Sequence, residues 1–127
     1  MRTILFRGKR LDNGEWVEGY YIRRADNTHF IVTMRPNEYG KVEYPVIQVD
    51  PNTVGQYTGM RDDFGCKVYE GDITVDVGYP FECANRKVVY DEEHGAYKFV
   101  GSTGYLVSQD FNEMKVIGNI HDNPELL

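Results

Sequence analysis

The chain has 127 residues, which is enough for one domain or for two small subdomains that share a core. It is 41% hydrophobic with a net charge of −6, which excludes a disordered chain and argues against a uniformly basic nucleic-acid binder. No apolar run approaches the roughly 18 residues that span a bilayer, no signal segment opens the chain, and two cysteines are too few for a disulfide scaffold. We therefore expect a cytoplasmic protein with reduced thiols and no membrane association.

Aromatic and β-branched residues, separated by turns of Asn, Asp and Gly, predict strands along the first half of the chain. The expected strands are Thr3–Arg7, Trp16–Arg24, Thr28–Thr33 and Val42–Val49, with an exposed loop over Arg35–Lys41. Pro45 interrupts the last of these strands, which indicates an edge strand or a bulge. Asp50-Pro51-Asn52-Thr53 then predicts a single helical turn, because Asp can cap free N–H groups and Pro favours the first helical position.

The second half continues in short strands. They are predicted at Gly55–Gly59, Cys66–Tyr69, Ile73–Val77, Lys87–Asp91, Ala96–Val100 and Val116–His121. No segment has helical periodicity over more than about three turns. The sequence therefore predicts an all-β fold, in which residues 1–50 form an N-terminal β-meander and residues 51–127 a small C-terminal barrel of SH3-like character.

The charges are unevenly placed along the chain. Residues 1–48 carry eight Lys or Arg against six Asp or Glu, whereas residues 49–127 carry six against fourteen. The acidic half should repel phosphate backbones. The basic residues of the first half leave a local positive patch open: Arg7, Lys9, Arg10, Arg23 and Arg24. The sequence does not decide whether these residues share one face.

The spacing of the possible ligands argues against metal and phosphate sites. The set Cys66, Cys83, His94 and His121 lacks the close pairs that a structural zinc site uses. The acidic set Asp62, Asp63, Glu70 and Asp72 suits Ca²⁺ or Mg²⁺ chemically but matches no EF-hand spacing, and a solvated acidic turn explains it better. Gly101–Gly104 lacks the Lys of a phosphate-binding loop. We predict no metal and no cofactor.

Catalytic arrangements are equally absent from the pattern. Neither Cys66 nor Cys83 has a neighbouring residue that would activate a thiolate. Glu70 and Asp72 could form an acid–base pair on one strand face, but Glu-Gly-Asp is more typical of a turn in which Asp72 bonds a backbone N–H. We therefore predict no catalytic residues.

Aromatic residues are the strongest remaining signal, because they exceed what a small barrel core must hold. They are Tyr20, Tyr21, Tyr57, Tyr69, Tyr79, Phe81, Tyr97 and Tyr105. Tyr is enriched at protein interfaces, although ordinary cross-strand pairing is the alternative explanation for most of them. The candidate interaction surface comprises Tyr57, Arg61, Tyr69, Glu70 and Asp72. An edge strand near Pro45 and the Pro-Glu-Leu-Leu tail also favour a homo-oligomer.

Four blocks of the sequence resemble the YopX family of phage and prophage proteins. They are Phe6–Gly19, Val49–Ile73, Val88–Tyr97 and Val116–Leu127, in family order and over about half the chain. Many family members continue the opening Phe-Arg with Ala-Trp, where this chain has Gly8 and Lys9. The resemblance implies an all-β fold and a phage or prophage gene. It implies no activity, because the family has no established one.

Three hypotheses for function follow. The first is a non-catalytic interaction protein, encoded by a phage or prophage, that binds itself or another protein of phage or host. The second is a nucleic-acid-related small-barrel module that binds single strands through aromatic residues and Arg7, Lys9 and Arg10, or an acidic mimic of nucleic acid. The third is an enzyme, which no residue pattern supports.

Overall fold

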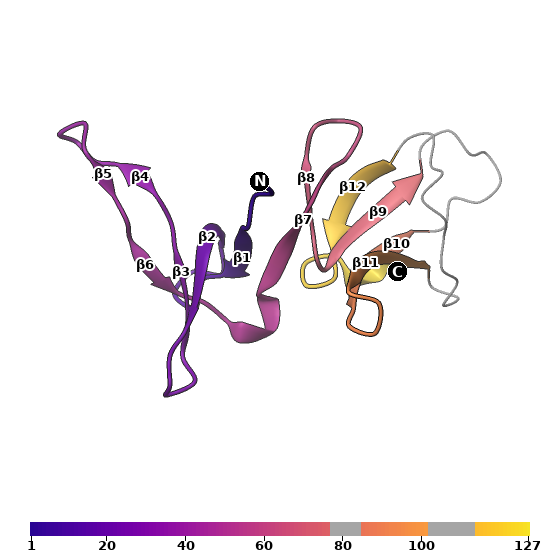
Figure 1. Ribbon diagram of the computed structural model, residues 1–127, viewed down its shortest axis with the longest axis horizontal. Coiled ribbons are helices and arrows are strands. Elements are labelled where there is room, and N and C mark those ends of the chain that lie inside the picture. The colour runs from indigo at the N-terminus through magenta and orange to yellow at the C-terminus, as the bar shows by residue number, and fades with distance from the viewer. Residues whose placement is uncertain (77–84, 102–113) are drawn as a thin grey trace. The chain divides into compact units, whose positions relative to one another are not determined.

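The computed structural model describes residues 1–76, 85–101 and 114–127, and in these ranges the chain is all-β (Figure 1). The strands are β1 (Phe6–Lys9), β2 (Trp16–Arg23), β3 (His29–Val32), β4 (Arg35–Pro36), β5 (Val42–Glu43), β6 (Val46–Gln48), β7 (Gly55–Arg61), β8 (Lys67–Tyr69), β9 (Asp72–Asp76), β10 (Arg86–Asp91), β11 (Ala96–Gly101) and β12 (Met114–Asn119). The described helices are single 3₁₀ turns, η1 (Pro51–Thr53) and η2 (Pro124–Leu126). The all-β prediction is confirmed.

The chain forms two compact units, Met1–Tyr57 and Thr58–Leu127. We expected the junction after residue 50, beside the predicted helical turn. That turn is η1, and it belongs to the first unit. Strand β7 begins in the first unit, where it pairs with β1, and ends in the second, where β8 is its neighbour.

Four strands of the first unit, joined by three pairings, form a closed arrangement. Antiparallel β1 pairs with β2, β2 with β3, and β3 with β6. A bridge between Arg10 and Val49 then joins the end of β1 to the end of β6. The main-chain bonds from Leu11 N to Gln48 O (3.2 Å) and from Asp50 N to Lys9 O (2.8 Å) flank that bridge. The meander is therefore curled so that it has an inner and an outer face.

The inner face holds the core of the first unit. Ile31 is fully buried and Val49 is 1% exposed. Gly8 and Gly19 lie on the same face by their register. A Cβ on Gly19 would come within 2.0 Å of the Val32 carbonyl oxygen, so the strands approach each other here more closely than any side chain allows. Because Gly8 and Gly19 have no side chain, the four strands can curl tightly around this core.

The turn η1 lies along the edge of β1 that does not pair with β2. Asp50 caps it by accepting a bond from Asn52 N (3.0 Å), as its sequence predicts. The Thr53 hydroxyl donates to the Asp50 carbonyl (2.6 Å) and accepts from Lys9 N (2.8 Å). Beyond η1, β7 pairs with Phe6 and Arg7 of β1. One edge of β1 is thus bonded in turn by Val49, η1 and β7.

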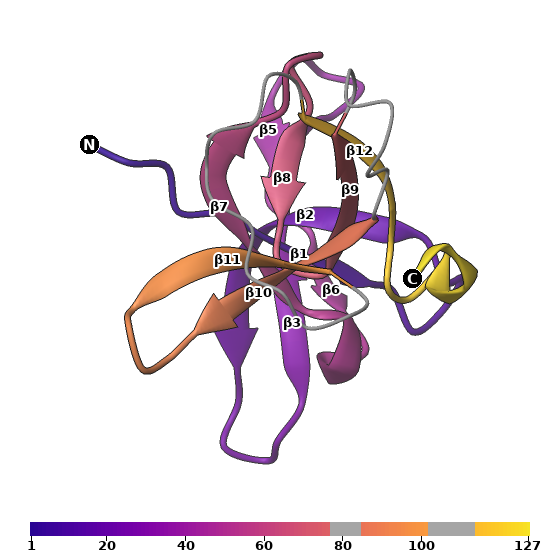
Figure 2. The same cartoon turned by 90° about the vertical axis from the view of Figure 1, so that its right-hand side faces the viewer.

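The second unit contains a four-stranded antiparallel sheet in the order β11-β10-β9-β12. Figure 2 shows β10 and β11 as a long twisted hairpin. The core cluster is Val68, Val88 and Phe99, against which Met114 and Val116 pack. This sheet does not confirm the SH3-like character that we expected, which stays a prediction.

The turn between β8 and β9 has the role that its sequence predicts. Gly71 has φ +89°, a backbone conformation that favours glycine. The Asp72 side chain is 1% exposed and accepts a bond from Tyr69 N at 2.7 Å. Gly71 also joins two other segments, because its N–H donates to Val88 O (2.8 Å) and its carbonyl accepts from Ile120 N (2.9 Å). The turn holds β9 between β10 and β12.

The Thr53 hydroxyl provides a direct test of this architecture. Thr53→Val keeps the shape but removes both hydroxyl bonds, leaving the Lys9 N–H without its partner, so we expect a loss of roughly 1–3 kcal/mol in unfolding free energy. Thr53→Ser keeps the hydroxyl and should lose about 1 kcal/mol or less. Urea unfolding of both variants measures the difference. Equal losses would contradict a structural role for the hydroxyl.

Candidate functional site

The five residues predicted as an interaction surface differ widely in exposure. Tyr57, Tyr69 and Asp72 are buried, at 8%, 4% and 1% exposure. Glu70 is half-buried and only Arg61 is exposed, with its guanidinium donating to the Gly65 carbonyl (2.8 Å). The two tyrosines thus contribute to the cores of their units. Of the other aromatic residues proposed for display, Tyr79, Phe81 and Tyr105 lie outside the described residues.

Asp62 illustrates what the polar residues of this region do in the fold. It is 6% exposed, and its carboxylate accepts backbone bonds from Phe64 (2.9 Å), Cys66 (2.8 Å) and Val116 (3.0 Å). Burial raises the pKa of Asp62, but the three N–H donors outweigh it, and the pKa lies below its usual 3.8. Asp63 likewise accepts from Met114 N. These carboxylates serve the backbone rather than a cation.

The sequence block near the C-terminus has the same character. Asn119, at 9% exposure, accepts bonds from His121 N (3.0 Å) and Asp122 N (2.9 Å) through its side-chain oxygen. Its own N–H donates to the Asn123 side chain (3.2 Å). A Cβ on Gly118 would lie 2.5 Å from that Asn123 side-chain oxygen. The block therefore builds a turn after β12.

Among the residues that the structure describes, neither metal set weighed from the sequence comes together as a group. Cys66 and His94 are exposed, His121 is half-buried, and Cys83 lies outside the described residues. Within the described ranges, a different acidic group comes together on the β10–β11 turn: Asp91, Glu93 and His94. The hydrogen bond that Asp91 accepts from His94 (2.7 Å) lowers the pKa of Asp91. Glu93 and His94 are exposed, and the Asp91 carboxylate also contacts the Lys98 ammonium at 3.5 Å, as is common in solvated acidic turns.

A continuous hairpin of the first unit runs from His29 to Val49, and the sequence did not show it. The register that pairs Val32 with Val46 in β3 and β6 continues unbroken into β4 and β5, where Pro36 pairs with Val42. A bond from Thr33 N to Pro45 O (3.0 Å) links the two parts. The segment expected as an exposed loop is therefore the far end of one β-arm (Figure 1).

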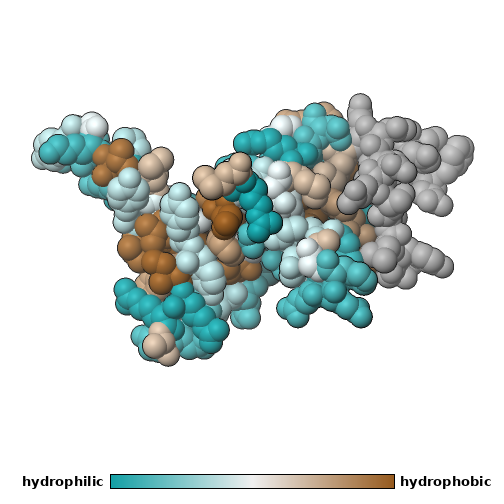
Figure 3. Space-filling view, viewed as in Figure 1, coloured by the Kyte–Doolittle hydropathy of each residue, from teal (hydrophilic) through white to brown (hydrophobic). Residues whose placement is uncertain are grey.

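One face of this arm is apolar and exposed, and we call it the apolar stripe. Its members alternate along both strands and continue the outer face of β2: Tyr20, Ile22, Val32, Met34, Val42, Tyr44 and Val46. Tyr20 is 66% exposed, Met34 68% and Tyr44 61%. Figure 3 shows hydrophobic residues gathered over this hairpin. The opposite face of the arm is polar: there the Arg35 guanidinium forms an ion pair with the Glu43 carboxylate at 3.2 Å.

Cations stack on the aromatic residues beside the stripe. The Arg7 guanidinium lies 4.7 Å from the centre of the Trp16 ring, and the Lys9 ammonium lies 5.5 Å from it. Arg24 lies over Phe30 at 4.3 Å. Three basic residues of the first half are thus divided between two aromatic rings. Cation–π contacts of this kind contribute about 0.5–1 kcal/mol each at exposed sites.

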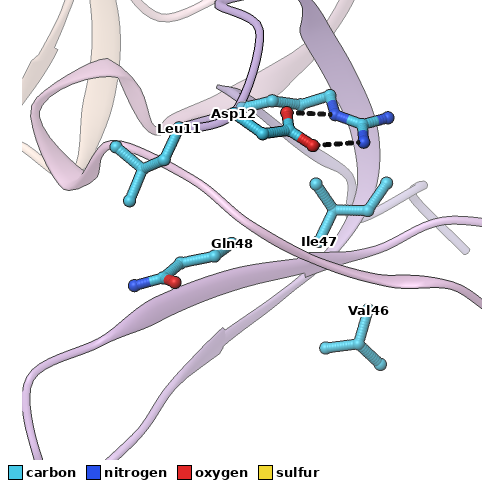
Figure 4. Close-up of a pocket in the computed structure, with 6 residues that line it drawn as sticks. Leu11, Asp12, Val46, Ile47 and Gln48 are labelled. Atoms are coloured by element: carbon cyan, nitrogen blue, oxygen red, sulfur yellow. Dashed lines mark hydrogen bonds and ion pairs between the residues drawn. The ribbon is translucent and has the colours of Figure 1, made fainter.

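A shallow hollow lies where the stripe reaches the edge of β6 (Figure 4). It has a volume of about 220 Å³ and is lined by Arg10, Leu11, Asp12, Val46, Ile47 and Gln48. Arg10 donates to Asp12 through two bonds, of 2.9 and 2.8 Å, and this hydrogen bonding lowers the pKa of Asp12. The guanidinium is therefore held by its neighbour, and the remaining lining is mostly apolar.

The sequence profile of the YopX protein family matches residues 5–127. The chain belongs to the YopX family. A crystal structure of protein EF1440 from Enterococcus faecalis has the same fold, with a TM-score of 0.61 and 22% identity over 100% of this chain and 99% of that one. No curated protein matches the sequence. Within the described ranges, no helix has the length and apolar character to cross a membrane.

The YopX blocks of this chain coincide with the polar turns described above. Thr53, Asp62 and Asp72 all lie in the long block Val49–Ile73, and Asn119 lies in the last one. Each places a side-chain oxygen where a main-chain N–H needs an acceptor. These four residues of the blocks therefore have structural roles in this YopX protein. The apolar stripe falls mostly between the blocks.

Asp62 makes the stability of this YopX protein sensitive to acid. Its pKa is depressed in the folded state, so its contribution is present above the unfolded value near 3.9 and is lost as the pH falls through the folded pKa. Asp62→Asn presents an amide donor to one of the three N–H groups, and we expect a loss of roughly 1–3 kcal/mol at pH 7. The unfolding free energy, measured with urea between about pH 6 and pH 3, should then fall less with acid in the variant than in the parent chain. Parallel pH profiles would contradict this account.

Proposed function

We propose that this YopX protein is a non-catalytic protein-interaction module, and that the apolar stripe is its binding surface. We place it in the cytoplasm as an accessory protein, encoded by a phage or prophage as the family resemblance implies. The single observation that supports the proposal is the exposure of the stripe on a β-arm whose other face is polar.

The physical argument rests on the cost of leaving such a surface in water. A two-stranded ribbon is marginally stable alone, and contiguous apolar patches on soluble proteins mark interaction sites. Burial of apolar area contributes about 25 cal/mol per Å², and Met34, Tyr44 and Val42 are each more than half exposed. Tyr and Met are also enriched in the centres of protein interfaces. A protein partner fits this surface better than a small polar substrate does.

A second candidate function is binding of single-stranded nucleic acid, and one observation favours it. Trp16 lies beside β1 with Arg7 and Lys9 over its ring. Single-strand-binding proteins combine aromatic stacking with a basic groove in this way. The net charge of −6 opposes the idea, as does the engagement of the two cations with the indole itself.

Photo-crosslinking tests the proposed surface. A photo-reactive phenylalanine analogue replaces Tyr20 in the stripe or, as a matched control, Tyr90 of the second unit, which is 44% exposed. After irradiation in the producing cells, we expect adducts with a polypeptide, from this chain or another, at position 20 and not at position 90. Equal yields at both positions, or none at position 20, would contradict the proposal.

The chain contains one tryptophan, so its fluorescence reports on the second candidate directly. Under the proposed protein-binding function, a single-stranded oligonucleotide of about 20 residues leaves the Trp16 emission unchanged at about 0.15 M salt. Saturable quenching that weakens with added salt would instead support the nucleic-acid module. A duplex of the same length is the control for non-specific effects.

A further inference from the structure

We infer that the partner of the apolar stripe is a second copy of this chain, which pairs through the outer edge of β5 and β6 in an antiparallel register centred on Tyr44. The inference rests on the proposed function and deepens it by naming the partner and the contact. Three features of the β-arm support this inference. One edge is open to pairing, the opposite edge is blocked, and the residue order along the open edge is symmetric about its centre.

The open edge follows from the hydrogen bonds inside the arm. Within it, Thr33 N bonds to Pro45 O at 3.0 Å and Asn37 N to Lys41 O at 2.7 Å. In an antiparallel ladder, residues alternate between bonding the partner strand and pointing away from it. The N–H and C=O groups of Val42, Tyr44 and Val46 therefore point outward. Among the described strands, β6 is the last of its sheet, so these groups lie on a sheet edge.

The two prolines of the arm make its edges unequal. Pro36 lies at an outward-pointing position of β4, where it removes a donor from that edge. Pro45 lies at an inward-pointing position, where its carbonyl accepts from Thr33, so it leaves the outer edge of β5 and β6 intact. Proteins commonly protect free edges with proline. Here only the β4 edge is protected in that way.

The residue order along the open edge is symmetric about Tyr44. Antiparallel pairing with a second copy, centred there, places Tyr44 opposite Tyr44 and Val42 opposite Val46. These residues are 61%, 54% and 52% exposed in the single chain. Aromatic and β-branched cross-strand pairs of this kind stabilise a sheet by roughly 0.2–1 kcal/mol each. Pairing about a two-fold axis at Tyr44 gives the open edges of both copies their hydrogen-bond partners at once. It leaves no open edge at which further copies could add.

The charges also favour a second copy over a charged partner. The exposed members of the stripe are all uncharged, so two-fold pairing brings no like charges together. Glu43, on the other face, already pairs with Arg35 of its own arm and comes opposite Pro45 of the second copy. An acidic or basic partner would find no complementary charge on this edge. An identical edge supplies the N–H and C=O groups that the open edge can bond and places uncharged side chains beside one another.

Light scattering coupled to gel filtration tests the inference. At about 10 µM the full chain should have twice the 14.7 kDa mass of one chain. Tyr44→Lys should halve that mass, because it places two cations opposite each other in the paired edge. Tyr39→Lys is the matched control: Tyr39 is 79% exposed at the tip of the same arm, outside the paired residues, and should leave the mass unchanged. A monomer mass for the unmodified chain overturns the inference, as does equal behaviour of the two variants.

A second measurement reports the register even where Tyr44→Lys disturbs folding. In a chain whose native cysteines are replaced by Ser, Tyr44→Cys should be joined to its copy by a short thiol cross-linker, whereas Tyr39→Cys should not. Cross-linking at position 39 alone would overturn the Tyr44-centred pairing. A monomeric chain whose photo-adducts at Tyr20 contain only a different polypeptide would refute self-pairing while leaving the proposed interaction function standing. A monomer without such adducts would refute both.

Discussion

The Thr53 hydroxyl makes the contact on which the first unit depends. It donates to the Asp50 carbonyl and accepts from Lys9 N, and so places η1 against the open edge of β1. Without η1, the chain would leave β6 at Val49 and reach β7 without the acceptor that Thr53 gives to the Lys9 N–H. A buried N–H without an acceptor costs about 1–3 kcal/mol, a large fraction of the stability of a small unit. The bonding of β1 between the Val49 bridge and β7 therefore rests on this turn.

The second unit repeats the same solution with different residues. Asp62 fixes a turn to β12, and Asp72 fixes the turn from which β9 begins. In each case a short polar side chain, placed next to its own backbone, accepts the N–H groups that the strands cannot bond. Chains with many short strands have many such turns. This is why the YopX blocks are rich in Asp, Asn, Thr and Gly while the buried side chains of the cores lie partly elsewhere.

The sequence predicted those elements that depend on local chemistry. The capped turn at Asp50 and the bond from Asp72 to nearby backbone both follow from a few adjacent residues. Most strands were also placed correctly, because turn residues delimit them. The burial of Tyr57 and Tyr69 could not be predicted from the residues next to them in the sequence. A strand pattern shows that two faces differ, but not which of them another element covers.

The candidate surface was missed for a related reason. Thr28–Thr33 and Val42–Val49 were both predicted as strands, but their pairing depends on a register across the intervening turn. The common register brings Met34 onto the same face as Tyr44, two residues that no local motif connects. Pro36 and Pro45 were visible from the start, yet only the hydrogen-bond alternation shows which edge each one affects. Function in this protein is therefore inferred from pairing, not from motifs.

Amide hydrogen exchange at Lys9 tests most directly whether η1 holds the fold of the first unit. Its N–H lies at the edge of β1, and its acceptor is the Thr53 hydroxyl rather than a strand. The account predicts that this amide exchanges as slowly as the central amides of β2 and β3, through cooperative opening of the whole unit. Fast exchange at Lys9, with β2 and β3 still protected, would show that η1 detaches freely and would contradict the account.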